Sequence, residues 1–356
     1  MIDRFGYTGT LPASFFTLVP PLYAELPYTL HEDPAAVQRL FDLESARNEI
    51  IVYTDHRRLR LVGIFPKDSA EAHFGFWETT DNLSINQEAF ALFEADAKAR
   101  GKANITGPLH FNTFQRYRLR LVELPSWGVF DREPVNPVYY GCLLEQLGYA
   151  PQSLFESRCI CKEDIPAVYM NKKLYLEEVQ KIPYDFVPLT PETWQQYEQE
   201  IFELVHEVFG SNPAYKPVPR EQFNMLYNLA FAQKLCPNSS VLFRHKETEK
   251  FVAMSFCHPN YQSLPLPAGV SPTFARDYPR LREKVLLVKT VGVHPDFRQQ
   301  GLMTYLGAYT MLTFKELYEE VIFCLMRSDN YSTHFTNSLP YELAKYALFG
   351  KSIDAS

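Results

Sequence analysis

The same order of β-rich and helical segments occurs twice along this chain of 356 residues. In each half the order begins with two β-rich runs around a polar turn, which is the pattern of a β-hairpin. A further strand and a helix follow each predicted hairpin, and the first of these helices stops at Gly101, as helices commonly do. The hairpin, strand and helix are predicted at 49–65, 72–78 and 85–100 in the first half, and at 241–256, 285–293 and 301–318 in the second.

Both halves then continue with a strand, a helix that an asparagine opens, and a final strand. Asparagine is a good N-cap, and Pro137 stands where the first helical turn tolerates proline. The repeated order predicts a duplicated α/β unit with a boundary between about 164 and 182, and therefore two domains, 1–165 and 166–356. These last elements are predicted at 103–107, 140–147 and 154–160, and at 321–326, from Asn330 onward, and 341–349.

The composition narrows the partners of such a protein. A net charge of −7 does not provide the dense basic face that nucleic acid requires, so nucleic acid is not expected as a partner. Prolines interrupt the run 11–27, nothing longer is apolar enough to span a bilayer, and no signal peptide is apparent, which predicts a cytoplasmic protein. Of the six cysteines only Cys159 and Cys161 lie close in sequence. Without a second pair, we expect reduced thiols and no metal site.

One segment of the second half carries the clearest chemical signal. A valine-rich strand ends at His294-Pro295, and a short turn leads into a helix that begins near Gly301. A helix N-terminus offers free backbone N–H groups and a partial positive charge, which together bind phosphate. Gly301 allows the backbone to approach a ligand closely, and Arg298 adds a formal charge. The sequence therefore predicts a phosphate-binding turn.

This turn resembles the pyrophosphate-binding motif of the GNAT (GCN5-related N-acetyltransferase) superfamily, which reads Arg or Gln, two residues, Gly, one residue, and Gly or Ala. The present sequence reads Arg298-Gln299-Gln300-Gly301-Leu302-Met303, so a methionine replaces the small last residue. The strand end Val293-His294-Pro295 also resembles that superfamily. Further segments resemble the superfamily or a group of double-GNAT proteins within it, so that the resemblance covers nearly the whole chain. They lie at 107–112, 136–140, 147–149, 257–262 and 321–330.

The resemblance implies two tandem GNAT-like domains, each a mixed, mostly antiparallel sheet flanked by helices. It also implies a thioester donor, either acyl-CoA or the phosphopantetheine of an acyl carrier protein. Pantetheine is expected to pair with the strand before the turn, and the phosphates are expected at the turn itself. The donor-binding residues assigned in this way are Thr290, Val291, Gly292, Val293, Arg298, Gln299, Gln300, Gly301, Leu302, Met303, Thr304 and Asn330.

The corresponding place in the first half reads Trp77-Glu78-Thr79-Thr80-Asp81-Asn82 and lacks the glycine turn. Its two carboxylates are expected to repel a pyrophosphate. We therefore expect the first domain to be degenerate in donor binding, to brace the second domain and to shape the acceptor pocket.

The catalytic groups are less well defined, because the tyrosine acid that is usual in the superfamily falls near Asn337 in this chain. Tyr331, His334 and Tyr341 are nearby substitutes for that acid. His258, at a predicted strand end, is a candidate base, and the alternative is a structural histidine bonded to the backbone. Cys324 lies on a strand beside the expected thioester and could form an acyl-enzyme, but the sequence shows no motif that pairs it with a base.

The resemblance implies an N-acyltransferase that acts on an amine of an amino acid, a peptide or another small metabolite. The alternatives are a non-catalytic acyl-CoA-binding scaffold and a tRNA-dependent aminoacyl transferase. The proline-rich segment 259–284 is either a lid or an ordered surface excursion. The 27 phenylalanines and 22 tyrosines either fill large cores or line an apolar tunnel for an acyl chain.

Overall fold

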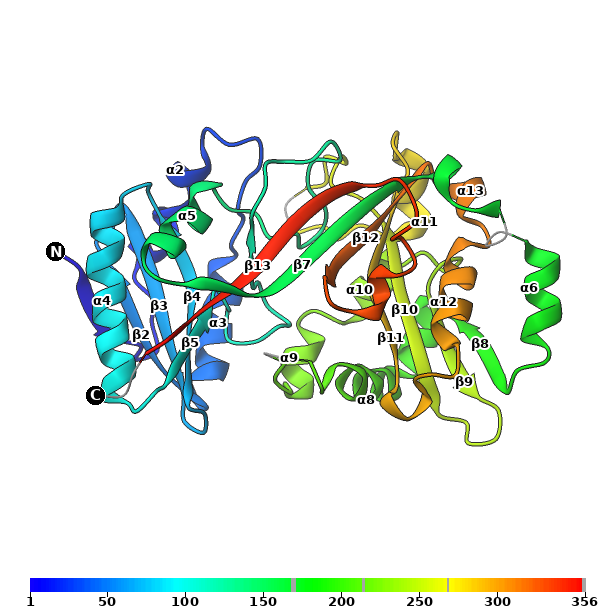
Figure 1. Ribbon diagram of the computed structural model, residues 1–356, viewed down its shortest axis with the longest axis horizontal. Helices are drawn as coiled ribbons and strands as arrows, with labels where there is room; N and C mark the ends of the chain where they lie inside the picture. Colours follow the sequence, from blue (N-terminus) through cyan, green and yellow to red (C-terminus); the bar gives the residue numbers. More distant parts are fainter. Residues whose placement is uncertain (168–170, 213–214, 268, 354–356) are drawn as a thin grey trace. The chain divides into compact units, whose positions relative to one another are not determined.

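The computed structural model describes residues 1–356 apart from 168–170, 213–214, 268 and 354–356, without the side chains of Lys172, Leu174 and Tyr331. The chain forms two compact units (Figure 1). The units are not the two halves of the sequence, because a short segment of the first half folds into unit 2 and the last strand ends in unit 1. Unit 1 consists of Met1–Glu123, Arg132–Phe155 and Lys345–Ser356, and unit 2 of Leu124–Asp131 and Glu156–Ala344.

Unit 1 contains a mixed sheet in the order β1-β2-β3-β4-β5-β13, and the short strand β6 also pairs with β13. Only β4 and β5 are parallel, and the other recorded pairs are antiparallel. Its strands are β1 (Asp3–Gly6), β2 (Asn48–Thr54), β3 (Leu59–Pro66), β4 (Glu71–Thr79), β5 (Asn104–Gly107) and β6 (Leu119–Arg120). Its helices are α1 (Ala13–Thr17), α2 (Val19–Tyr23), α3 (Pro34–Ser45), α4 (Leu83–Ala99) and α5 (Tyr139–Gln146).

Helices cover both faces of this sheet, which explains why almost all residues of its central strands are buried. In β2, Ile51 and Tyr53 belong to a core that includes Phe93 of α4. The alternate residues of β2, including Val52, belong to a second core with Phe41 of α3. Because successive side chains of a strand point to opposite faces, a strand buried on both sides reads as a continuous apolar run.

Unit 2 repeats this plan, with strands in the order β7-β12-β11-β10-β9-β8. Strands β11 and β12 are parallel, whereas β8, β9, β10 and β11 pair antiparallel in turn. Strands β7 and β13 each run through both units. The strands are β7 (Ala150–Cys161), β8 (Tyr184–Pro188), β9 (Val241–His245), β10 (Phe251–Pro259), β11 (Val285–Val293), β12 (Glu320–Arg327) and β13 (Glu342–Ser352).

The helices of unit 2 also lie on both faces of its sheet. On one face, Leu286 of β11 shares a core with Met311 and Phe314 of α12 and α13. On the other face, Phe256 of β10 contacts the ring of Trp194 in α7. The α-helices are α6 (Lys172–Val179), α7 (Pro191–Gln196), α8 (Glu198–Phe209), α9 (Arg220–Asn224), α10 (Leu229–Lys234), α11 (Phe274–Asp277), α12 (Leu302–Met311) and α13 (Phe314–Leu317). Single 3₁₀ turns are η1 (Lys162–Asp164), η3 (Tyr278–Arg280), η4 (Pro295–Phe297) and η5 (Tyr331–Thr333).

Three segments of unit 2 differ from or refine the sequence predictions. The helix predicted at 301–318 is divided into α12 and α13. The segment after Asn330 forms the 3₁₀ turn η5 instead of an α-helix, with bonds to the third preceding residue such as Thr333 N to Asn330 O. The segment 259–284 contains α11 and η3, and its Phe274 and Tyr278 pack against the core of unit 2, which favours an ordered excursion.

Candidate active site

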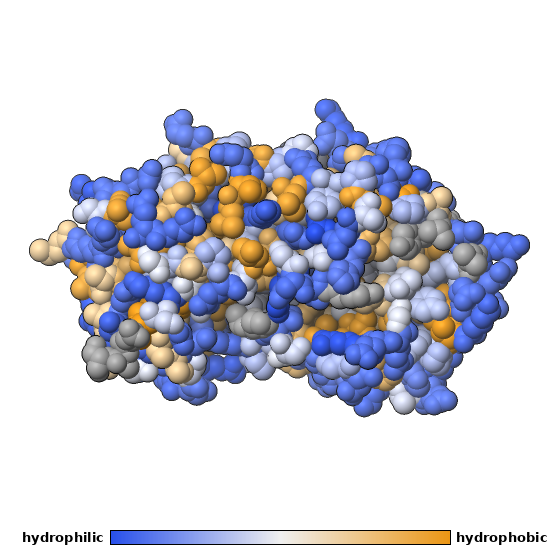
Figure 2. Space-filling view, in the orientation of Figure 1, coloured by the Kyte–Doolittle hydropathy of each residue, from blue (hydrophilic) through white to orange (hydrophobic). Residues whose placement is uncertain are grey.

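Strands β11 and β12 pair only at their beginnings. The last recorded pair joins Val288 to Phe323, although β11 continues to Val293 and β12 to Arg327. Burial changes at the same place, because β11 becomes partly exposed at 289–291. Figure 2 shows a hollow in the lower part of unit 2 with hydrophobic residues at its base. Backbone N–H and C=O groups without a sheet partner can pair with an extended ligand.

Irregular backbone accompanies this separation. The register between β10 and β11 changes between Thr290 and Val288, which leaves Lys289 as an extra residue on β11. On β12, Leu325 has a φ of +54°, which is uncommon for a residue other than glycine. A β-bulge bends and twists its strand. The bulge at Lys289 therefore accounts for the departure of β11 from β12.

The helix after β11 begins with an open N-terminus. Gly301 precedes α12 with φ +75° and ψ 7°, a left-handed conformation that favours glycine. Within α12, all of which the structure describes, no side chain caps the first turn and no acidic residue lies in it. A Cβ added at Gly301 would meet no atom within 4 Å. Open space beside free N–H groups and the positive end of a helix fits a phosphate.

Two side chains fix this turn to the surrounding strands and helices. The Arg298 guanidinium donates to the carbonyl oxygens of Val293, at 3.3 Å, and of Val208 in α8, at 2.9 Å. Gln300 accepts a hydrogen bond from the hydroxyl of Tyr184 in β8. Both residues are exposed and hold the turn in place, and the Arg298 charge remains beside it.

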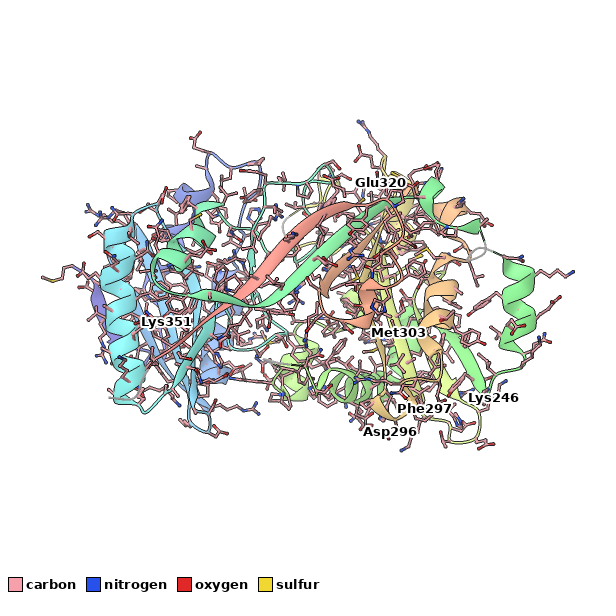
Figure 3. All side chains as sticks on the ribbon, viewed as in Figure 1. Lys246, Asp296, Phe297, Met303, Glu320 and Lys351 are labelled. Atoms are coloured by element: carbon pink, nitrogen blue, oxygen red, sulfur yellow. The ribbon has the colours of Figure 1, made fainter. Side chains whose placement is uncertain are left out.

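The other residues of the turn divide into exposed and buried positions. Gln299 and Thr304 are exposed, whereas Leu302 is buried in the core beneath α12. Met303 packs partly against that same core, and Figure 3 shows it on α12, with Asp296 and Phe297 of η4 at the lower end of unit 2. Met303 therefore contributes to the support of the turn.

His258, the predicted base, lies at the end of β10 and is 1% exposed. Its Nδ1 lies 2.8 Å from the carbonyl oxygen of Pro259. A carbonyl only accepts, so Nδ1 carries a proton and Nε2 of the neutral ring has a lone pair. Burial, together with the charge of Lys234, lowers the pKa of His258, against the opposing effect of Asp131.

Asp131 faces this lone pair, and it was not identified from the sequence. Its Oδ2 lies 3.5 Å from His258 Nε2, and among the described atoms Nε2 has no other partner. Lys234 of α10 forms an ion pair with the Asp131 carboxylate, and Lys289 Nζ donates to the Asp131 main-chain oxygen at 2.6 Å. Burial raises the pKa of Asp131, but His258 and the two lysines outweigh it and hold the pKa well below its usual range.

A short apolar segment positions Asp131. Phe130 is 2% exposed and packs among residues of β7, β11 and β12, and Trp127 packs against the same cluster. The sequence signal was the apolar run that includes these two aromatic residues in an otherwise irregular loop. Nothing in its spacing indicates that the loop would fold into the other unit.

The remaining predicted residues lie after β12. Asn330 is exposed, and its carbonyl accepts hydrogen bonds from the N–H and hydroxyl of Thr333. His334 is exposed and follows η5. Tyr331 begins η5, and its side chain lies outside the described part of the chain. Arg158 of β7 donates to Thr336 and to Asn337, both at 2.8 Å, which anchors the segment that carries these residues.

The corresponding place in unit 1 is closed. The N-terminus of α4 is capped by Asn82, whose side-chain oxygen accepts from Ile85 N at 3.1 Å. Glu78 is 1% exposed and forms an ion pair with Arg116 at 2.8 Å, while the hydroxyls of Tyr23 and Tyr140 also donate to it. We expected Glu78 to repel a phosphate, but its charge is buried and already paired with Arg116. Glu78 therefore has a structural role.

A neighbouring backbone also occupies this place. Leu109 N donates to Phe74 O at 2.7 Å, and a Cβ added at Gly75 would lie 2.5 Å from Leu109 O. Beyond the third pair of β4 with β5, the main chain of Leu109 thus bonds to β4. In unit 2 the equivalent edge of β11 is partly exposed.

In the described part of the chain, the histidine, cysteine and acidic side chains form no group of three or more that could hold a metal ion. The helices of this part include none that is both long and apolar enough to cross a membrane.

No protein-family model and no curated protein sequence matches the chain, but solved structures resemble it. A tandem GNAT protein from the clavulanic acid biosynthesis pathway has a TM-score of 0.54 at 12% identity, with 100% of both chains covered. An Enterococcus faecalis V583 protein described as a probable N-acyltransferase has a TM-score of 0.55 at 10% identity, covering 100% of this chain and 73% of that one. A Kribbella flavida GCN5-related N-acetyltransferase has a TM-score of 0.50 at 8% identity, covering 100% and 72%. The predicted architecture is confirmed: the chain has the fold of the tandem GNAT proteins.

Proposed function

We propose that the protein is an N-acyltransferase that moves an acyl group from acyl-CoA, or from the phosphopantetheine of an acyl carrier protein, to an amine. The acceptor is a small metabolite, an amino acid or a peptide. One observation carries this proposal: β11 continues past its last pair with β12 and leads directly to the open N-terminus of α12. An extended pantetheine arm and a pyrophosphate require these two features in this order.

The donor-binding roles follow from this arrangement. The backbone of 290–293 binds the pantetheine arm, and the turn 298–304 binds the phosphates. Asn330 follows β12, the strand from which β11 separates. In unit 1 the equivalent strand edge and helix N-terminus are occupied by its own residues, so we assign no donor to unit 1.

The reaction requires transfer of a proton as well as of the acyl group. The amine nitrogen attacks the thioester carbon, the new C–N bond forms, and the C–S bond breaks with its electron pair on sulfur. A base must take the proton of the attacking nitrogen, and the thiolate must be protonated. His258 is the candidate on the base side, and Tyr331 and His334 are the candidates on the acid side.

Two measurements test this function. Isothermal titration with CoA, and with 4′-phosphopantetheine for the carrier-bound alternative, measures donor binding. Release of free thiol from acetyl-CoA and longer acyl-CoAs, with L-amino acids, glucosamine and spermidine as acceptors, measures turnover. Binding together with amine-dependent thiol release supports the proposal. Binding without release would instead identify a non-catalytic acyl-CoA-binding protein, and absence of CoA binding would contradict the donor site.

A further inference from the structure

The pair formed by His258 and Asp131 has an unusual hydrogen-bonding state. With Nδ1 committed to the Pro259 carbonyl, Nε2 presents a lone pair toward a carboxylate oxygen 3.5 Å away. Two acceptors then face each other in a largely buried place, and a single proton between them would give Nε2 a partner and Oδ2 a second one besides Lys234. The structure thus contains a site that is ready to receive one proton.

The two side chains differ in exposure, and this difference decides which of them a ligand can reach. The Asp131 side chain is 30% exposed, whereas that of His258 is 1% exposed. A ligand can therefore reach Asp131 but not the imidazole. Lys234 is the last residue of α10, and its side chain, which is 14% exposed, forms an ion pair with the same carboxylate.

The pair also lies beside the place where β11 leaves β12. His258 is paired across the sheet with Leu287, and the main chain of Asp131 is bonded by Lys289, the extra residue of the bulge. The Lys289 ammonium also lies 4.6 Å from the ring centre of Phe130. The Lys289 side chain thereby holds Asp131 close to β11, the strand to which the thioester arm is assigned.

We propose that Asp131 accepts the proton of the attacking amine and that His258, acting through Asp131, holds this proton with it. The inference rests on the proposed acyl transfer. As the C–N bond forms, the proton leaves the amine nitrogen for the Asp131 carboxylate and becomes shared with His258 Nε2. The thiolate leaves with the electron pair of the C–S bond and is protonated, and the pair is regenerated when it releases its proton to solvent. Asp131 is the catalytic residue, and His258 is a positioning residue.

The charged and titratable groups around the pair define its pH dependence. Lys234 approaches from α10, Lys289 from β11, and the ring of Tyr261 is stacked on His258 at 6.1 Å. The positive charges of the two lysines keep the Asp131 carboxylate ionised at neutral pH, so the pair is available to accept a proton. The rate per concentration of unprotonated amine should therefore be constant from neutral to mildly alkaline pH and fall in acid.

The test compares Asp131→Asn, His258→Gln and the control Glu198→Gln. Glu198 is also a partly exposed acid, at 34%, in an ion pair, with Arg220 at 2.9 Å. With acetyl-CoA and the fastest amine of the panel, Asp131→Asn should lower kcat roughly 100-fold, a typical loss for a missing base, and abolish the constant region of the pH profile. CoA affinity should stay within about twofold, and the control should retain full activity.

A second measurement does not depend on turnover. Nitrogen-15 NMR of the histidine side chains, assigned with His258→Gln, should show a neutral His258 protonated at Nδ1 whose titration moves in Asp131→Asn. An unchanged His258 titration, or an Asp131→Asn enzyme with the activity and pH profile of the original, would overturn this inference alone. A protein that releases no thiol with any acceptor would overturn the proposed function itself.

Discussion

Replacement of Gly301 by glutamate should abolish CoA binding while the fold is retained. The added side chain meets open space, because no atom lies within 4 Å of the Cβ position. The cost to folding is therefore confined to the left-handed backbone, at roughly 1–2 kcal/mol, or a decrease of a few degrees in melting temperature.

The cost to binding is larger and has two parts. A carboxylate about 5 Å from one phosphate charge costs roughly 1 to 3 kcal/mol, depending on how well water screens the pair. A pyrophosphate presents more than one such charge, and the side chain also occupies space that the ligand needs. Together these effects should weaken CoA binding by about 100-fold or more.

Two control variants separate charge from backbone effects. Gly301→Gln introduces the same strain and nearly the same volume without the charge, so it should bind CoA more tightly than Gly301→Glu. Gly101→Glu adds the same charge in unit 1, at a glycine with φ +66° that also faces open space, and should leave CoA affinity unchanged. Isothermal titration with CoA, with circular dichroism as a check of folding, provides the measurement. A Gly301→Glu protein that binds CoA as tightly as the original would refute the assignment of the phosphate turn.

Three further outcomes are expected. Crystals soaked in CoA should show ligand density beside the turn 298–304 only, and pyrophosphate density near 77–82 would contradict the asymmetry between the units. A donor series from acetyl to decanoyl should favour longer chains if an apolar tunnel exists, since four extra carbons contribute about 3 kcal/mol; a rate that falls steadily with chain length would indicate acetyl transfer. Arg276, with help from Arg280, lowers the pKa of the buried Asp277 from 3.8 to about 2. This contribution to stability should be complete above pH 3.8 and disappear as the pH falls toward 2, so the difference in melting temperature between the original protein and Asp277→Asn should narrow over that range, and a constant difference would argue against it.

The elements that could be predicted from the sequence are those with strong local signals. The hairpins of β2 with β3 and of β9 with β10 carry alternating or continuous apolar runs around polar turns, and these signals depend on nearby residues alone. The glycine that opens α12 is equally local, because a left-handed residue at a helix start calls for a residue without a Cβ.

The missed features depend on contacts that are distant in sequence. Asn330 suggested an N-cap, but Arg158 from another strand binds the side chains of Thr336 and Asn337 and stabilises a series of 3₁₀ bonds. Asp131 has no motif, and only the burial of Phe130 beneath β11 and β12 brings it to His258. The aromatic residues could be counted but not placed, and many of them prove to fill the cores of the two units.

The path of the chain through the two units bears on how the protein is made. Residues 349–352 of β13 pair with β5, from Phe349 with Gly107 to Ser352 with Asn104. A ribosome releases β13 after all the other strands, so unit 1 completes its sheet only after the strands of unit 2 have been synthesised, although β1 to β5 emerge first. Separate expression of 1–165 and 166–356 would leave the first product without its closing strand and the second without Asp131. Each unit of this duplicated fold therefore contains a segment from the other half of the sequence.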